Sequence, residues 1–211
     1  MLAIIKAQDY SKNKLKQFAE EIQTKNSQIP NENRDSSKIG LAIKAIEEAR
    51  YQLDEDDIRK MYVNLISSTV DNRKNDAVSP RLATVVAQLG ISEANLLKLL
   101  FKANNHTILT SELWGTGSSG NFKNSPTVLY TNESFFKKYD SSIDILKSLG
   151  VINFPYKRKL TEHEKEYSLI NNYLSTLTPL FQLSVNEHSE FREGYIEYTN
   201  FGEQLSHCIF E

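Results

Sequence analysis

The sequence contains a single cysteine, Cys208, among 211 residues. One cysteine excludes an internal disulfide and suits a reducing compartment. Long apolar runs are also missing, and none approaches the roughly 20 residues of a membrane span. The apolar run from Leu2 to Ile5 is shorter than the about 7–15 residues that a secretory signal needs. These absences predict a cytoplasmic protein without a membrane span.

Charge of one sign is lacking as well. The chain has 25 lysines and arginines against 27 aspartates and glutamates, a net charge of -2. Hydrophobic residues make up 39% of the sequence, and its mean hydropathy is -0.47. The hydrophobic content is ordinary for a soluble fold, although the mean hydropathy leans polar. A chain of this length buries roughly 70% of the surface that it exposes when unfolded, which is enough for one large core or two small ones.

The most informative stretch runs from Ile39 to Phe101, where apolar spacings of three and four predict four amphipathic helices. The first helix has one apolar stripe, formed by Ile39, Ala42, Ile43, Ile46 and Ala49. The second is expected to bury Ile58, Met61, Tyr62, Leu65 and Thr69. The fourth is apolar enough for the centre of a bundle, with Leu96, Leu97, Leu99, Leu100 and Phe101.

Capping residues separate these helices. Asp54 is a good N-cap for the second helix, and Glu55–Asp57 place negative charge at the positive end of its dipole. Ser79-Pro80 opens the third helix with proline at the first helical position. Gly90 is expected to end it in the left-handed conformation, and Ser92 to cap the fourth. A divalent-cation or catalytic site in the acidic cluster Asp54–Asp57 is the less favoured alternative, because consecutive first-turn carboxylates already complement the dipole.

These residues resemble a known family. The similarity covers the acidic helix start and the apolar-Asn-Leu pattern of Val63-Asn64-Leu65, and it continues through Gln88-Leu89-Gly90-Ile91-Ser92. It returns at Tyr198–Gly202 and at Cys208. The pattern is similar to that of the abortive infection alpha family, bacterial proteins associated with defence against phage and without a well-defined activity. That family usually has histidine before the proline, where this chain has Ser79.

A helical arm is predicted ahead of the four helices, with Leu15, Phe18 and Ile22 on one face. Its beginning is basic, which would suit contact with phospholipid or nucleic acid. Glu20-Glu21 interrupts the basic run within a turn, so a solvated helix face is the favoured interpretation. The polar segment from Asn26 to Ser37 is predicted to be a linker.

The second half of the chain changes pattern. Thr107–Thr110 is a predicted short strand, and residues 115–126 are rich in glycine, serine and asparagine, which predicts a long surface loop. The remaining predicted elements are helices at 132–139, 141–149, 161–178 and 200–210, and strands at 151–154, 181–185 and 191–199, the last two joined as a hairpin by 186–190.

This order resembles a winged-helix module in which residues 92–103 supply the first helix and 156–190 are inserted into the wing. In a DNA-binding member, helix 141–149 would be the recognition helix. Its chemistry is wrong for that role, because it carries Asp144 and follows Asp140, and Lys147 is its only basic residue.

The surrounding charge agrees. Residues 131–211 contain 8 lysines and arginines and 12 aspartates and glutamates, so their net charge is 8 − 12 = −4. Such a segment lacks the cations that bind phosphates. The basic run Lys157-Arg158-Lys159 is interpreted as solvated surface, and the module is predicted to be a packing or partner-binding scaffold.

Two further motifs partly resemble a nucleotide-binding site and a metal site. Gly115–Gly120 has dinucleotide-binding spacing, but that site needs a helix directly after the glycines, and Asn121–Pro126 cannot start one. We interpret it as a flexible loop that Trp114 anchors by burial. His163 with Glu164 lacks the second histidine of a metallopeptidase helix. The other histidines, His106, His188 and His207, are scattered, and Cys208 is predicted to be a buried, inert thiol.

The sequence therefore predicts a mainly α protein, a helical bundle followed by a small α+β winged-helix-like module. Its predicted parts are an arm and linker (1–38), the bundle (39–104), a short strand and loop (105–130) and the module (131–211). We assign no catalytic, cofactor-binding or metal-binding residue, and we expect the chain to act by binding a macromolecule, with protein favoured over nucleic acid. The alternatives are a winged-helix DNA-binding regulator and a nuclease or nucleotide hydrolase built from carboxylates distant in sequence.

Overall fold

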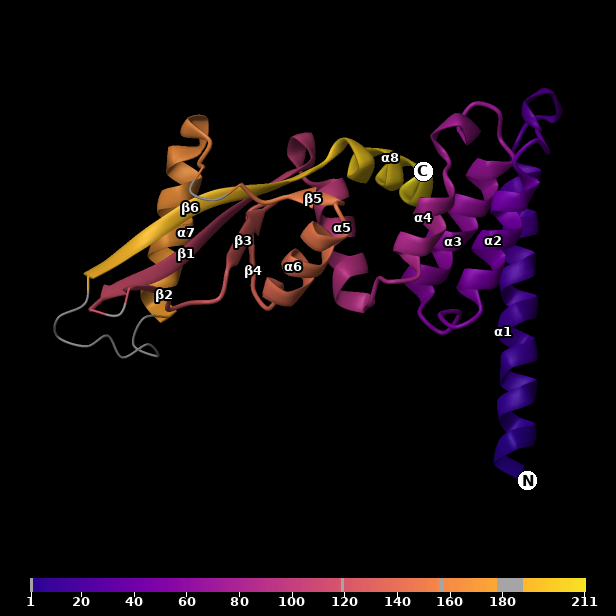
Figure 1. Ribbon diagram of the computed structural model, residues 1–211, viewed down its shortest axis with the longest axis horizontal. Coiled ribbons are helices and arrows are strands. Elements are labelled where there is room, and N and C mark those ends of the chain that lie inside the picture. Colours follow the sequence, from indigo (N-terminus) through magenta and orange to yellow (C-terminus); the bar gives the residue numbers. More distant parts are fainter. Residues whose placement is uncertain (1, 119, 156–157, 178–187) are drawn as a thin grey trace. The chain divides into compact units, whose positions relative to one another are not determined.

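The computed structural model describes residues 2–118, 120–155, 158–177 and 188–211. The chain divides into two compact units, Met1–Ala94 with Glu203–Glu211, and Asn95–Gly202. The first is called the helical unit below and the second the sheet unit (Figure 1).

The helical unit consists mainly of α1 (Leu2–Ser27), α2 (Ile39–Ala49), α3 (Asp56–Thr69) and α4 (Pro80–Val86) (Figure 1). It also contains the beginning of α5 (Ile91–Lys102) and most of α8 (Asn200–Phe210). Short 3-10 turns cover Asn31–Asn33 and Asn75–Ala77. The four helices predicted between Ile39 and Phe101 are thus confirmed as α2 to α5.

Helix α3 lies at the centre of the helical unit, because α1, α2 and α4 all pack against it. Its predicted apolar stripe is buried: Ile58, Met61, Tyr62, Leu65 and Thr69. Fully burying one large apolar side chain contributes about 1.5–3 kcal/mol, so the four large apolar residues of this stripe contribute substantially to the stability of the unit.

Three predicted caps differ from the structure. Ser92 lies inside α5 instead of before it. The N-cap of α3 is Glu55 rather than Asp54, and it makes no side-chain capping hydrogen bond. Predicted helix ends commonly differ from observed ones by one or two residues. Gly90 is not left-handed. It precedes α5, and its backbone N–H donates to the Glu93 carboxylate at 2.8 Å. This is the return bond of a capping box, so Gly90 starts the following helix instead of ending the previous one.

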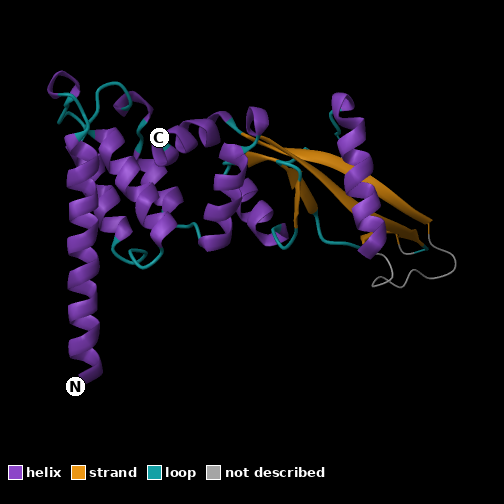
Figure 2. Cartoon of the chain, turned by 180° about the vertical axis from the view of Figure 1, so that it is seen from behind, coloured by secondary structure: helices purple, strands orange, loops and turns teal. Residues whose placement is uncertain are grey.

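The sheet unit contains an antiparallel sheet. In the described residues its strands are β1 (Thr107–Gly117), β2 (Gly120–Lys123), β3 (Val128–Thr131), β4 (Ser134–Phe136), β5 (Ile152–Asn153) and β6 (His188–Tyr198). The strand order is β4-β3-β1-β6-β5, with β2 paired to β1 beyond β3. The long strands β1 and β6 pair from Thr107↔Glu197 to Thr116↔His188. Helices α6 (Asp140–Ser148) and α7 (Glu164–Leu177) complete the unit (Figure 2).

Helix α7 covers one face of this sheet. Its Tyr167, Ile170 and Leu174 pack with Leu109 and Val128 in one buried cluster. The Tyr167 hydroxyl donates to the Gly194 carbonyl at 2.9 Å, which ties the helix to β6. The predicted helix at 161–178 corresponds to a 3-10 turn at Thr161–His163 followed by α7, and residue 178 lies outside the described residues.

The predicted fold class is wrong. The chain is not mainly a helical bundle with a winged-helix module, because a six-stranded antiparallel sheet is central to the described part of residues 95–202. Residues 115–126, predicted as a loop, include the end of β1 and all of β2, and the predicted helix at 132–139 contains β4. Asn132 and Glu133 both have positive φ, 47° and 57°, and form the tight turn of the β3–β4 hairpin.

The other predicted elements of this half fare better. Helices at 141–149 and 200–210 correspond to α6 and α8, and the strand at 191–199 corresponds to β6. Gly150 follows α6 in the left-handed conformation, with a φ of 73°. The predicted strand at 181–185 and residues 186–187 of its hairpin loop lie outside the described residues. The rest of that predicted loop, residues 188–190, is instead the beginning of β6.

The segment Tyr198–Gly202 closes the sheet unit by packing and capping. The Tyr198 hydroxyl donates to the Leu97 carbonyl at 2.9 Å, and the Thr199 hydroxyl accepts from the Gly202 backbone N–H at 2.9 Å. Gly202 lies against Val151, so closely that an added Cβ would be 1.9 Å from the Val151 carbonyl oxygen. Only glycine fits there. In the segment Tyr198–Gly202, the residues that resemble the family therefore serve packing and capping.

Candidate protein-binding surface

Helix α2 is apolar on two sides, and only one of them is covered. The buried side is made of the small residues Ala42, Ala45 and Ala49, which let α2 approach α3 and α4 closely. The bulkier residues Ile39, Ile43 and Ile46 are exposed by 51%, 52% and 40%. We call these three residues the isoleucine face. Their predicted place in one buried stripe with the alanines is corrected, because the neighbouring helices cover only the alanine edge of that stripe.

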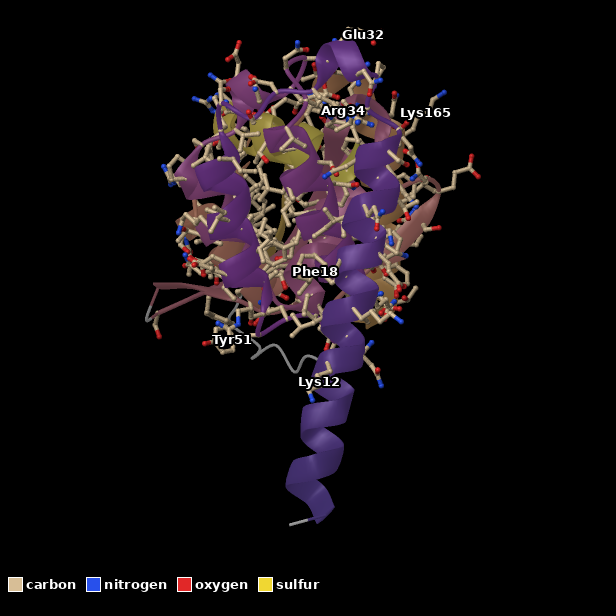
Figure 3. All side chains as sticks on the ribbon, turned by 90° about the vertical axis from the view of Figure 1, so that its right-hand side faces the viewer. Lys12, Phe18, Glu32, Arg34, Tyr51 and Lys165 are labelled. Carbon is tan, nitrogen blue, oxygen red and sulfur yellow. The ribbon has the colours of Figure 1, made fainter. Side chains whose placement is uncertain are left out.

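The isoleucine face borders a groove. A cavity of about 890 Å³ lies beside it, lined mainly by apolar atoms. Helix α1 supplies Ala19 and Ile22 to this groove, α2 supplies Ile46, and Arg34 and Asp35 lie in its lining as well. Figure 3 looks onto the helical unit with Phe18, Arg34 and Tyr51 labelled. The groove and the isoleucine face form a single candidate surface for a partner, because Ile46 belongs to both.

Helix α1, which lines one side of the groove, is fixed to α3. Phe18 of α1 is 2% exposed. Arg59 of α3, also 2% exposed, donates from Nε to the Glu21 carboxylate at 3.2 Å and from Nη1 to Asp56 at 2.7 Å. Burial acts to lower the pKa of Arg59, but the hydrogen bonds to Glu21 and Asp56 outweigh it and raise the pKa. The guanidinium therefore stays charged and holds α1 in place.

Exposed apolar side chains in such an arrangement are unusual. Isolated surface isoleucines need no explanation, but an apolar patch beside a groove marks an interaction site. The three isoleucines follow the i, i+4, i+7 spacing with which a helix contacts another helix. The spacing of the three exposed isoleucines is therefore compatible with packing against another helix.

The sheet unit contains the strongest cluster of charged side chains. Glu112, Lys123 and Asp140, called the charge cluster, meet around the Thr127 hydroxyl. Lys123 donates to Glu112 at 2.9 Å and also to Asp140, and the Thr127 hydroxyl lies 2.6 Å from Glu112 and 2.8 Å from Asp140. The Trp114 indole N–H donates to the other Glu112 oxygen at 2.7 Å. The Ser111 hydroxyl donates to the Asn171 side chain of α7. Because side chains alternate along a strand, Glu112 lies on the opposite face of the sheet.

The electrostatics of the charge cluster favour a structural role. Burial acts to raise the pKa of Glu112, but the hydrogen bonds from Thr127, Lys123 and Trp114 outweigh it and lower the pKa. Asp140 follows the same balance, with Lys123 as its main donor. Both carboxylates are therefore ionised and bound to donors at neutral pH. A general acid needs a carboxyl group that keeps its proton near neutral pH, which neither residue does.

Trp114 and the glycine-rich motif are part of the same sheet. The Arg192 guanidinium lies 3.9 Å from the centre of the Trp114 ring, a cation–π contact. Gly117 pairs with Gly120 across the β1–β2 hairpin. The motif therefore turns one strand into the next and has no helix after it to receive a pyrophosphate. Its predicted flexible-loop conformation is wrong, and it is a β-hairpin in the described residues.

The remaining candidates are scattered or inert. His207 lies within 2.8 Å of Glu211, and His163 within 3.6 Å of Glu166, each with a near neighbour in sequence. Cys208 is buried, which confirms that part of its prediction, and burial raises the pKa of its thiol to about 11. Within the described ranges, no group of three or more histidine, cysteine, aspartate or glutamate side chains is arranged to hold a metal ion.

The acidic cluster Asp54–Asp57 lines a surface depression of about 480 Å³ with Lys60 and Ile91. Asp56 accepts a hydrogen bond from Arg59, which lowers the Asp56 pKa. That carboxylate holds α1 in place through Arg59, so its contact is structural.

In the part of the chain that the structure covers, no individual helix has both the length and the apolar character to cross a bilayer. Helices α4 and α5 meet these criteria only when taken together, and they are bent by 117° at the break between them.

The described residues define a two-unit α+β protein. Residues 10–209 match the abortive infection alpha family, so this chain belongs to that family. No curated protein matches the sequence. An uncharacterized protein from the hydrocarbon-degrading marine bacterium Alcanivorax borkumensis SK2 is similar in structure, with 15% sequence identity and a TM-score of 0.34. The match covers 62% of this chain and 93% of the other.

Proposed function

We propose that this member of the abortive infection alpha family acts by binding another protein chain, and that the isoleucine face with its groove is the binding surface. The observation that carries the proposal is the exposure of Ile39, Ile43 and Ile46 on a well-packed helix. A partner that covers them gains roughly 25 cal/mol for each Å² of apolar surface removed from water. An α-helix is the partner element that fits their spacing.

The sheet unit supports this division of roles. Its charge cluster is held by internal hydrogen bonds, which lower the pKa values of Glu112 and Asp140 and raise that of Lys123. Each group is therefore held in its ionised form at neutral pH, whereas a general acid or base works best with a pKa near the operating pH. The exposed apolar surface of the helical unit has no such internal partner. Association is therefore the activity that the geometry favours.

Affinity co-purification tests the proposal. The tagged chain would be recovered from phage-infected and uninfected bacteria, alongside Ile43→Lys. This change places a charge in the middle of the isoleucine face without disturbing a buried contact. The matched control is Leu169→Lys on α7, where the leucine is 49% exposed. We expect at least one protein to be recovered with the unchanged chain and with Leu169→Lys, and to be lost with Ile43→Lys.

Two results would contradict the proposal. One is equal recovery of every associated protein with Ile43→Lys. The other is turnover of a nucleotide, or cleavage of nucleic acid, by the purified chain at a rate that Ile43→Lys leaves unchanged. The second result would place the activity in another part of the molecule.

A further inference from the structure

The isoleucine face has charges at both of its ends. Asp35 and Lys38 lie just before α2, and Glu47 and Arg50 lie in and after its last turn. Within the described residues, Glu47 and Arg50 have no hydrogen-bond or ion-pair partner. Each end thus carries one acidic and one basic group, which makes the face electrically self-complementary.

We propose that the partner on this face is a second copy of the chain, with the two α2 helices packed antiparallel across a two-fold axis beside Ala42 and Ile43. The inference rests on the proposed function, because it takes the isoleucine face to be the binding surface. Two-fold pairing is the commonest symmetry of protein oligomers, and it places the same patch of each copy against itself.

The register follows from the sequence. Around such an axis, residues whose numbers sum to about 85 face each other. Ile39 then meets the second copy's Ile46, and the two Ile43 side chains meet near the axis. The same antiparallel alignment brings Glu47 and Arg50, at the C-terminal end of α2, near Asp35 and Lys38 of the second copy, which lie just before its α2. One alignment therefore matches the apolar residues and both pairs of opposite charges.

The charged groups retain the capacity for these contacts. Asp35 accepts from the Ser37 N–H and hydroxyl and from Asn75, while a carboxylate has about four acceptor positions. Lys38 donates to the Asn75 carbonyl and lies 3.8 Å from the exposed Asp76, and an ammonium has three donors. Neither residue has to give up a buried contact to meet the second copy.

Sedimentation equilibrium of the purified chain over a concentration series up to about 100 µM tests the inference. We expect a mass that rises from 24.1 kDa to twice that value. Ile43→Lys should raise the dissociation constant at least about tenfold, because it places two ammonium groups at the axis. Leu169→Lys should leave it unchanged.

A charge exchange tests the register. The double variant Glu47→Arg with Arg50→Glu keeps the net charge, and it alters only the two side chains that lack a partner within the described residues. In this variant the new arginine at position 47 approaches Lys38 of the second copy, and the new glutamate at position 50 approaches its Asp35. Because like charges repel, we expect the dissociation constant to rise about tenfold or more. Circular dichroism confirms that each variant folds. Equal association of the double variant would overturn the antiparallel register.

The failure of this inference is distinguishable from the failure of the proposed function. A chain that is monomeric at every concentration, but still recovers another protein through Ile43, would overturn the second copy as partner and keep the binding surface. A monomer that recovers no protein through this face would overturn both.

Discussion

The two units of this chain differ in which side chains they bury and which they leave exposed. The sheet unit buries charge and satisfies it internally, as in the charge cluster of Glu112, Lys123 and Asp140. The helical unit satisfies its one deeply buried arginine, Arg59, but leaves Ile39, Ile43 and Ile46 exposed to water. The sheet unit also exposes single apolar side chains, such as Leu169 and Ile145. The three isoleucines differ because they share one face of a helix beside a groove. This difference supports the proposed binding surface in the helical unit.

The largest effect tests how tightly the sheet unit is packed. Gly202→Ala forces a methyl group to within 1.9 Å of the Val151 carbonyl oxygen, so the chain must shift. We expect a loss of about 3 kcal/mol or more in the free energy of unfolding, measured by urea denaturation. The control is Gly40→Ala in α2, where an added methyl group meets nothing within 4 Å. That variant should be as stable as the parent or more stable by about 0.5–1 kcal/mol. Equal effects at the two glycines would contradict the described packing.

Removing the buried charge of the helical unit should have the next largest effect. Arg59→Met takes away the group that joins Glu21 to Asp56, and we expect a loss of about 2–3 kcal/mol in the free energy of unfolding. The loss stays moderate because the side chains of Glu21 and Asp56 are 29% and 70% exposed and can be hydrated. Lys60→Met, at the exposed neighbouring position, is the control. A loss below about 0.5 kcal/mol for Arg59→Met would show that this ion pair does not hold α1.

The helices were predictable from the sequence because their signals are local. Spacings of three and four, with capping residues such as Ser79-Pro80, located α2 to α5. The sheet was not predictable because its main pairing joins residues far apart, Thr107 with Glu197. Its buried positions also include Thr110, Ser111 and Glu112, so β1 lacks the apolar alternation that marks a strand. The partners of these groups come from other strands and helices and are invisible in the local pattern.

The candidate surface was half predictable. Sequence spacing identifies the apolar stripe of α2, but alanine and isoleucine count alike in such a pattern. Which edge is covered depends on where α3 and α4 pack, and close packing favours the smaller Ala45 and Ala49. Arg59 gave no signal at all, because an arginine in a helix is ordinarily solvated.

Acidification should lower the free energy of unfolding of the sheet unit by destabilising the charge cluster. The ordinary pKa values of Glu112 and Asp140 are 4.5 and 3.8, and the folded chain lowers both. Their contribution to stability is therefore complete above about pH 5 and is lost as the pH falls below 4 through the folded values. Glu112→Gln should cost about 1–2 kcal/mol at pH 7 and should flatten this decline. Unfolding free energies from pH 7 to pH 3 check the prediction, and parallel curves for the two chains would refute it.

The smallest effect belongs to the isoleucine face. Ile43→Lys should change the free energy of unfolding by less than about 0.5 kcal/mol, because surface substitutions away from buried contacts have little effect. The measurement belongs at a low protein concentration, where association does not contribute. A loss of 2 kcal/mol or more, about the cost of removing a core isoleucine, would mean that Ile43 belongs to the core of its own chain.

The most direct test of the association surface is chemical crosslinking at its centre. Ile43→Cys introduces an exposed thiol, while the native Cys208 is 2% exposed and has a raised pKa, so it reacts little. Treatment with a short bismaleimide should convert Ile43→Cys to a covalent species of twice 24.1 kDa. Ile145→Cys, at a position of similar exposure in α6 (39%), should remain a monomer. A monomeric Ile43→Cys chain, or equal crosslinking at both positions, would contradict the account.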